Sequence, residues 1–450
     1  MRLAATVAYR PALYFNDSFE YVGVARRLFP YQAKPDGYAL LLRVLEPAHS
    51  LRLVAALQHL LGLGVGVALY ALLLRLRLPR WAAALAVAPP LLDGNIIQLE
   101  EVILSDTLFT SLLVAAAVVL LRHRVPTSLP AAAAGLLLAG AALTRTVGLP
   151  LIGVVVVTML LRRSRWRATA ALLTAAAVPL ALYAGWYHSQ QGRWSITGVD
   201  GVFLYARSTT FVDCRTSHPP ADLAVLCPSE PLGGRRPAPD YVWHTDSPLR
   251  KVPGNVFDPR TNALAKRFAT RAISRQPVDY ASTVTRDVLR TFHWSRDAYP
   301  SRAVLDGLRF TDRPWAIPRR TFIPGGTVLG DLRAYEQGSA ATSTHPALVD
   351  ALARYQYIVA ARGPMLAGLL VMGFAGLTLT RKRAVGRGAG AVLLAFAVTL
   401  IILPPALTAY DNRYVLPAIP FASAAAALGA SALIRRGALK SAEPPAYFVG

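Results

Sequence analysis

The sequence predicts a mainly α-helical protein that crosses a membrane many times. Of its 450 residues, 54% are hydrophobic, and the mean hydropathy is +0.38. The apolar residues form long runs, and a run of about 20 such residues is enough to cross the hydrocarbon core of a bilayer. The short polar segments between these runs alternate between a basic kind and an acidic kind. An ordinary soluble domain shows neither feature.

The basic segments are built almost wholly from arginine, and Glu443 is their one acidic residue. Their basic residues are Arg75, Arg77, Arg80, Arg122, Arg124, Arg162, Arg163, Arg165, Arg167, Arg381, Lys382, Arg383, Arg387, Arg435, Arg436 and Lys440. By the positive-inside rule these segments are cytoplasmic. The alternate segments carry Asp17, Glu20, Asp36, Glu46, Asp93, Glu100, Glu101 and Asp411. We expect this second set on the outer face of the plasma membrane.

The predicted membrane topology explains the net charge of +23. Basic residues in short cytoplasmic loops orient the chain and contact anionic lipid. The sequence therefore predicts membrane lipid as a partner and no nucleic acid. Arginine far outnumbers lysine and alanine is abundant, which indicates a high-GC genome, such as an actinobacterial one.

Nine spans are expected after residue 50. Seven are direct: 51–74, 81–99, 102–121, 168–187, 358–380, 388–403 and 414–434. Segment 129–161 is too long for one helix, and a split at Thr144-Arg145-Thr146 leaves two pieces of about 24 Å each. Only this split keeps Arg122 and Arg162 on the same side of the membrane. We therefore expect a turn at Arg145 near the outer surface and a cytoplasmic C-terminus.

Nine crossings that end in the cytoplasm place the chain before residue 51 outside. Residues 1–15, however, contain too few apolar residues to cross the membrane. We expect that the true start codon lies upstream of Met1 and that the first helix is truncated. The alternative is a chain that begins outside. Residues 16–50 then form an outer loop with two short helices, broken at Pro30 and Pro35, that lie flat at the interface.

Three regions follow from this topology. They are an N-terminal membrane part (1–187), an extracytoplasmic insert of α/β or irregular structure (188–357), and a C-terminal membrane part with three spans and a cytoplasmic tail (358–450). Within the insert, helices are expected on both sides of Pro277. The second has one apolar face, with Tyr280, Val284 and Val288, that either packs in a core or docks on the membrane surface.

Both cysteines, Cys214 and Cys227, lie in the insert. An oxidising compartment permits a disulfide between them, which we expect, whereas two buried free thiols are the alternative. Two cysteines alone cannot form a structural zinc site, and the histidines lack ligand spacing. No such metal site is predicted.

The outer loop begins with Asn16-Asp17-Ser18-Phe19-Glu20-Tyr21. At the membrane surface, a carboxylate can take a proton from an acceptor hydroxyl while a lipid-borne donor enters from the bilayer. The simpler alternative is that Asp17 or Ser18 is a helix N-cap.

Four segments, in this order, resemble the GT-C superfamily of polytopic glycosyltransferases. They are the outer acidic segment, QLEEVILSDTLFTSLL, GLLLAGAALTRTVGLPL and YDNRYVLPAIPFASAAAA. The likeness covers the membrane part and is closest to protein O-mannosyltransferases and aminoarabinose transferases, which use polyprenyl-phosphate sugars. The sequence departs from the family in its incomplete first helix and in an insert that precedes the last three spans.

The resemblance implies an inverting transfer in which Asp17 is the general base. It implies Glu20 or Glu101 as a supporting carboxylate, and it places Arg413 and Tyr414 near the donor. A positioned arginine stabilises a leaving phosphate, so Arg145 and Arg413 are the candidates for binding it. Alternatively, each arginine reaches the interface or pairs locally, as Arg413 does with Asp411.

No cofactor is certain. Glu100, Glu101 and Asp106 are candidates for holding Mg²⁺ or Mn²⁺ together with Asp17, or they form a polar rim. The sequence thus predicts a hexosyl- or pentosyltransferase that moves a sugar from a polyprenyl-phosphate donor to a cell-envelope glycan, lipid or protein. The alternatives are a transporter or flippase of a lipid-linked or cell-envelope precursor, and a scaffold without catalytic activity.

Overall fold

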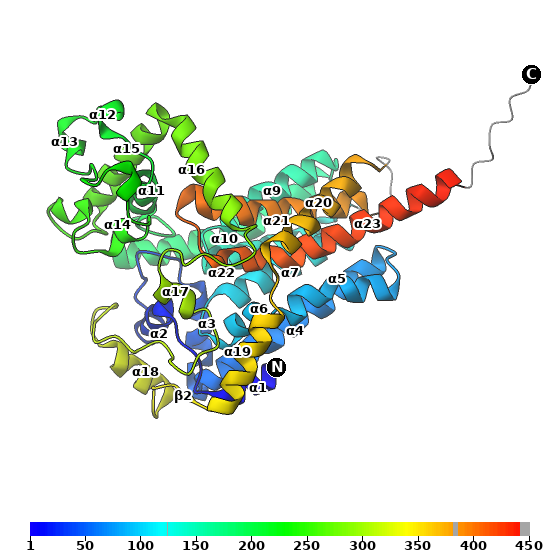
Figure 1. Ribbon diagram of the computed structural model, residues 1–450, viewed down its shortest axis with the longest axis horizontal. Helices are drawn as coiled ribbons and strands as arrows, with labels where there is room; N and C mark the ends of the chain where they lie inside the picture. The colour runs from blue at the N-terminus through cyan, green and yellow to red at the C-terminus, as the bar shows by residue number, and fades with distance from the viewer. Residues whose placement is uncertain (124, 381–385, 442–450) are drawn as a thin grey trace, which may run out of the picture.

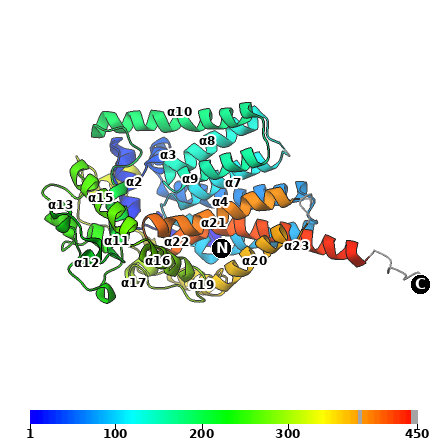
Figure 2. The ribbon, with the colours of Figure 1, turned by 90° about the horizontal axis from the view of Figure 1, so that it is seen from above.

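The computed structural model describes residues 1–123, 125–380 and 386–441. Among the predicted cytoplasmic charges, Arg124, Arg381, Lys382, Arg383 and Glu443 lie outside these ranges. Long helices pack side by side in one bundle, and a lobe built from α11 to α16 lies at one end of it (Figure 1). Viewed from above, α10 runs along one edge of the bundle beside α8 (Figure 2).

The expected spans are all helical. Those long and apolar enough to cross a membrane are α4 (Leu51–Arg75), α10 (Trp166–Gln191), α21 (Arg387–Leu407) and the stretch Asn412–Arg436, formed by α22 (Asn412–Val415), η4 (Leu416–Ala418) and α23 (Ile419–Ser441). Two bent pairs also qualify: α5 (Arg80–Leu92) with α6 (Gly94–Glu101), at 50°, and α19 (Pro346–Ile358) with α20 (Gly363–Thr378), at 45°. Shorter apolar helices are α7 (Asp106–Leu121), α8 (Ser128–Thr144) and α9 (Gly148–Leu161). The described chain is therefore a helical membrane protein, while nine crossings stay a prediction.

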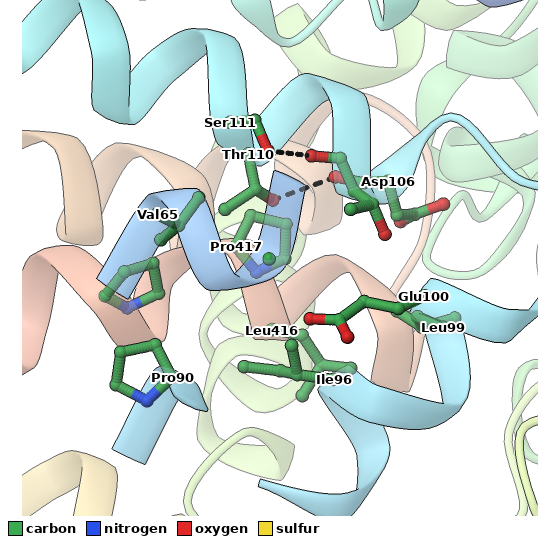
Figure 3. Close-up of a pocket in the computed structure, with 13 residues that line it drawn as sticks. Val65, Pro90, Ile96, Leu99, Glu100, Asp106, Thr110, Ser111, Leu416 and Pro417 are labelled. Carbon is green, nitrogen blue, oxygen red and sulfur yellow. Dashed lines mark hydrogen bonds between the residues drawn. The ribbon is translucent and has the colours of Figure 1, made fainter. Parts of the chain in front are cut away.

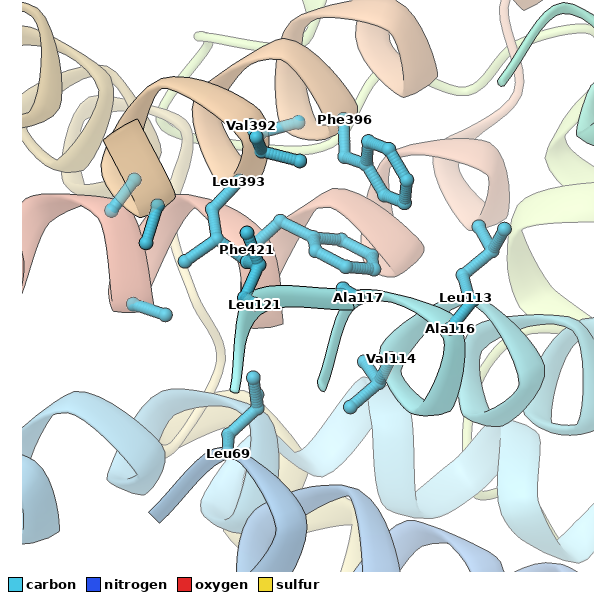
Figure 4. Packing of buried hydrophobic residues seen from close by; sticks show 14 of the residues in the cluster. Leu69, Leu113, Val114, Ala116, Ala117, Leu121, Val392, Leu393, Phe396 and Phe421 are labelled. Carbon is cyan, nitrogen blue, oxygen red and sulfur yellow. The ribbon is translucent and has the colours of Figure 1, made fainter. Parts of the chain in front are cut away.

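Side chains from α4, α7, α21 and α23 form the centre of the bundle. Leu69, Leu113, Phe396 and Phe421 are buried there together (Figure 4). Small residues bring neighbouring helices close: a Cβ on Gly376 of α20 would lie 2.2 Å from the Cα of Gly429 on α23. Such contacts are typical of helix packing in membranes.

The predicted split near Thr144-Arg145-Thr146 is confirmed, because α8 ends at Thr144 and α9 begins at Gly148. The turn is tight: Gly148 N–H donates to the Arg145 carbonyl oxygen at 2.9 Å. A Cβ on Gly148 would lie 2.6 Å from the Ala142 nitrogen, so glycine is needed there.

The predicted cytoplasmic arginine segments meet at the end of the bundle away from the lobe (Figure 1). Arg75 Nε donates to the Arg122 carbonyl oxygen at 2.7 Å, and Arg435 Nη2 donates to the Arg77 carbonyl oxygen at 2.6 Å. The structure therefore separates the arginine-rich ends from the acidic ends. Which end faces the cytoplasm stays a prediction.

The predicted pair of short helices between residues 16 and 50 is confirmed as α2 (Asn16–Arg27) and α3 (Gly37–Leu45). The expectation that both lie flat on the interface is wrong for α2. Its residues from Ser18 to Ala25 are all buried, and α2 packs against α3 and α18 (Val328–Glu336). Asp17 lies in the first turn of this buried helix.

The insert consists of two parts. The first is the lobe, with α11 (Asp200–Thr209), α12 (Cys214–Ser217), α13 (Ala221–Ala224), η2 (Leu232–Gly234), α14 (Asp240–Trp243), η3 (Pro248–Lys251), α15 (Pro259–Arg275) and α16 (Pro277–Arg290). The second contains α17 (Arg302–Asp306), α18, β2 (Ser343–Thr344) and α19, and it packs on the N-terminal segment through α1 (Arg2–Ala8) and β1 (Tyr9–Arg10). Neither alternative, α/β or irregular, describes the insert: its described residues form a series of helices, and β2 has only two residues.

The helix pair around Pro277 is present as α15 and α16. Val288 of α16 and Phe292, just beyond its end, pack against the membrane core, and Tyr280 Oη donates to the Ala406 carbonyl oxygen at 3.0 Å. This face of α16 therefore contacts α21 of the same chain, although Leu289 stays exposed.

Cys214 and Cys227 form a disulfide in the lobe, with 6.2 Å between their Cα atoms. A loop of this length stabilises a fold by about 3 kcal/mol, because it restricts the unfolded chain. We expect the Cys214→Ser/Cys227→Ser variant to lose about that much free energy of unfolding of the lobe. Hydrogen exchange of α11 and α15 measures the loss. Two free thiols in unreduced wild-type protein, found by mass spectrometry, would contradict the disulfide.

Candidate functional site

Asp17 lies in the first turn of α2, where the helix dipole favours a negative charge. Its Oδ2 atom accepts a hydrogen bond from Nη2 of Arg413 at 2.7 Å, although 396 residues separate the two in the sequence. The acidic segment at the start of α2 and the turn before α22 therefore meet at one place.

Lys34 is a second cation beside Asp17, and sequence reasoning did not identify it. Its Nζ atom lies 3.2 Å from Asp17 Oδ1 and 2.6 Å from Glu20 Oε2, and it also sits over the ring of Tyr21. Burial alone would raise the pKa of Asp17, but Lys34 and Arg413 outweigh it and hold that pKa well below its usual range. The one available signal was a single lysine in an outer loop whose other basic residues are all arginine.

Glu20 is almost completely buried beside Lys34. Burial raises its pKa from the usual 4.5 to about 7, even though Lys34 opposes the shift. A carboxyl group whose pKa is raised in the folded state stabilises the fold below its unfolded pKa, and that stability is lost as the pH rises through the folded pKa.

We therefore expect a Glu20-dependent loss of stability between about pH 4.5 and pH 7, of up to about 3 kcal/mol. Thermal unfolding of wild type and Glu20→Gln at pH 5 and pH 8 measures it. The glutamine variant should lose less stability over this interval, because its side chain does not ionise. An identical pH dependence in both proteins would contradict the expectation.

Arg145, which follows α8, lies together with Arg413 and Tyr414 of α22. The guanidinium carbons of Arg145 and Arg413 lie 4.5 Å and 5.2 Å from the centre of the Tyr414 ring. Arg145 also pairs with Asp106, and Arg413 Nε lies 3.3 Å from Asp411 Oδ2. The aromatic ring thus holds two cations near each other, an arrangement that suits one shared anion.

Glu101 does not belong to this site. Its Oε2 atom lies 2.9 Å from Nε2 of His59, while Glu100 binds Nδ1 of the same ring and Nε of Arg2. Both carboxylates are completely buried and need charged or polar partners. These partners come from α4 and α1. Of the two carboxylates expected to support Asp17, Glu20 shares Lys34 with it, whereas Glu101 pairs with His59.

The site does not fit a divalent cation well. In the described ranges, no group of three His, Cys, Asp or Glu residues is arranged to hold one. Glu100 and Glu101 are engaged with His59, and Lys34 and Arg413 already neutralise Asp17. Two cations beside Asp17 would repel a third.

A pocket lies between α4, α6, α7 and η4 (Figure 3). Its walls are mainly apolar and include Val65, Ile96 and Leu416. Its charged lining residues are Glu100 and Asp106, and Asp106 pairs with Arg145. The apolar walls fit a hydrocarbon chain, and Asp106 connects the pocket to the arginines.

No protein-family profile and no curated protein sequence matches the chain. Among solved structures, the chain is similar to ArnT from Cupriavidus metallidurans. The apo structure is 16% identical with a TM-score of 0.34, over 96% of this chain and 75% of that chain. The structure bound to undecaprenyl phosphate is 16% identical with a TM-score of 0.31, over 97% and 76%. Such TM-scores do not define a common fold, so function is argued from the site itself.

Proposed function

We propose that this chain transfers a sugar from a polyprenyl-phosphate donor to an acceptor hydroxyl on the outer face of the plasma membrane. One observation supports the proposal most strongly. A carboxylate, Asp17, pairs with Arg413, which shares the ring of Tyr414 with Arg145. Arg145 in turn pairs with Asp106, a lining residue of an apolar pocket between membrane helices. A chain of contacts thus connects the candidate base and anion site to the candidate lipid site.

The donor would bind in two parts. Its phosphate lies between Arg145 and Arg413, which can donate paired hydrogen bonds to phosphate oxygens. Its isoprenoid chain enters the apolar pocket, where burial of apolar surface stabilises it by about 25 cal/mol per Å². Tyr414 keeps the two guanidinium groups stacked on its ring and so prepares the anion site.

In the reaction, the acceptor oxygen attacks the anomeric carbon while Asp17 takes the hydroxyl proton. The bond between the anomeric carbon and the phosphate oxygen breaks, and polyprenyl phosphate leaves with the electron pair. Attack opposite the leaving group inverts the anomeric configuration. Arg145 and Arg413 stabilise the negative charge that develops on the phosphate. The acceptor is a cell-envelope glycan, lipid or protein.

The activity is tested with the purified protein in lipid nanodiscs. A panel of polyprenyl-phosphate hexoses and pentoses is supplied together with cell-envelope acceptor fractions. We expect release of polyprenyl phosphate that depends on the acceptor, with labelled sugar in the acceptor fraction. If no donor in the panel is consumed and the protein binds no polyprenyl phosphate, the proposal is wrong.

The outer location is tested at the two ends of α10, through the exposed residues Gln190 and Arg165. In intact cells, a membrane-impermeant thiol reagent should label Gln190→Cys and leave Arg165→Cys unlabelled. Permeabilised cells are the control and should label at both positions. The reverse pattern in intact cells would overturn the proposed orientation.

A further inference from the structure

We propose that the donor phosphate switches on the general base, because it competes with Asp17 for Arg413 and Lys34. The inference rests on the proposed function and adds an order of events to it. Without donor, Asp17 is held by its two cations. With donor, the cations turn to the phosphate and Asp17 becomes free to accept a proton.

The cations of the site all have carboxylate partners when no donor is bound. Arg145 pairs with Asp106. Arg413 pairs with Asp17 and Asp411, and Lys34 pairs with Asp17 and Glu20. An incoming phosphate therefore finds no unpaired cation among these three, and it must displace a carboxylate from one of them before it can accept hydrogen bonds from that cation.

Asp17 is the carboxylate that the phosphate can displace most easily from its cations. Its side chain is 23% exposed, whereas those of Asp106 and Glu20 are 3% and 4% exposed. A partly exposed carboxylate recovers water when it loses a cation, but a buried one remains without solvation. Asp17 is also shared by two cations, so it loses both contacts as they turn to one anion.

Arg413 stays in place when Asp17 leaves. Its Nε atom remains 3.3 Å from Asp411, and its guanidinium is stacked against Phe15 at 4.9 Å as well as against Tyr414. The arginine can therefore exchange one anion for another without moving from the site.

The exchange links binding to base strength. While Lys34 and Arg413 pair with Asp17, they hold its pKa low and make it a weak base. When the phosphate withdraws these cations, the pKa of Asp17 rises, since opposite charges nearby favour the ionised form. Asp17 then becomes an effective base only in a site that already holds a donor.

The test uses undecaprenyl phosphate as the probe and the full chain in nanodiscs. Asp17→Asn and Asp17→Ser remove the competing charge, so both should bind the probe about tenfold more tightly than wild type, a difference of about 1.4 kcal/mol. Asp17→Glu keeps the charge and should bind no more tightly than wild type. Asp331→Asn is the matched control, because Asp331 is a buried carboxylate that pairs with Arg27 at another place.

Tighter binding by the two neutral variants, with wild-type affinity in Asp331→Asn, supports the exchange. Equal or weaker binding by a folded neutral variant overturns it, while the proposed function stands if wild type still binds the probe. If wild type does not bind undecaprenyl phosphate at all, both the proposed function and this inference fail.

Discussion

Replacement of Asp17 by asparagine should lower the turnover of sugar transfer by about 10²- to 10⁴-fold. The amide occupies the same volume and can keep a hydrogen bond to Arg413, but it cannot take the proton of the acceptor hydroxyl. The rate constant at saturating donor and acceptor measures the loss. The same variant should bind donor phosphate more tightly, so turnover and affinity change in opposite directions.

Asp331→Asn is the control for this experiment as well. It also removes one arginine-paired carboxylate, and it should transfer sugar at nearly the wild-type rate. Undiminished turnover in Asp17→Asn would exclude Asp17 as the general base. In that case Glu20, the other carboxylate bound to Lys34, would be the next group to test.

The sequence was a good guide to the helices because periodicity and proline positions act locally. The helices α2 and α3 and the pair around Pro277 lie where these patterns predict them, and the break at Arg145 lies where segment length and charge placement predict it. The apolar surface of α2 could be recognised too, but not what covers it. That depends on α18, more than 300 residues later in the chain.

The same distinction applies to the residues predicted for the site, some of which the structure brings together. Asp17, Arg413, Arg145 and Tyr414 were selected by their order and by their side of the membrane, and the structure brings them together. Glu101 satisfied the same criteria and lies elsewhere. Its direction is set by His59, a polar residue inside an otherwise apolar helix. Such a residue was the available signal that a buried acid is nearby.

Lys34 shows a second reason why the sequence was insufficient. A charged side chain pairs with whichever opposite charge the fold brings close, and spacing along the chain does not reveal this. Lys34 is 17 residues from Asp17 and reaches it only because the chain turns back between α2 and α3. The electrostatic state of Asp17 therefore became visible only in three dimensions.

Replacement of Arg413 by lysine should lower turnover by about 10²- to 10³-fold, the usual effect of removing one positioned donor from a developing oxyanion. Lysine keeps the positive charge, but it lacks the planar group that stacks on Phe15 and Tyr414 and contacts Asp17 and Asp411 at the same time. The turnover number and the affinity for undecaprenyl phosphate should both fall. This pattern differs from that of Asp17→Asn, in which affinity increases.

Arg27→Lys is the matched control, because Arg27 also pairs with a buried aspartate, Asp331, but lies at the other end of α2. It should leave turnover within about twofold of wild type, in line with the small effect of substitutions away from a site. Gel filtration and circular dichroism establish that both lysine variants are folded. If Arg413→Lys transfers sugar as fast as Arg27→Lys, charge alone is sufficient at this position. The planar guanidinium would then have no part in stabilising the leaving phosphate, and Arg145 would have to provide that stabilisation.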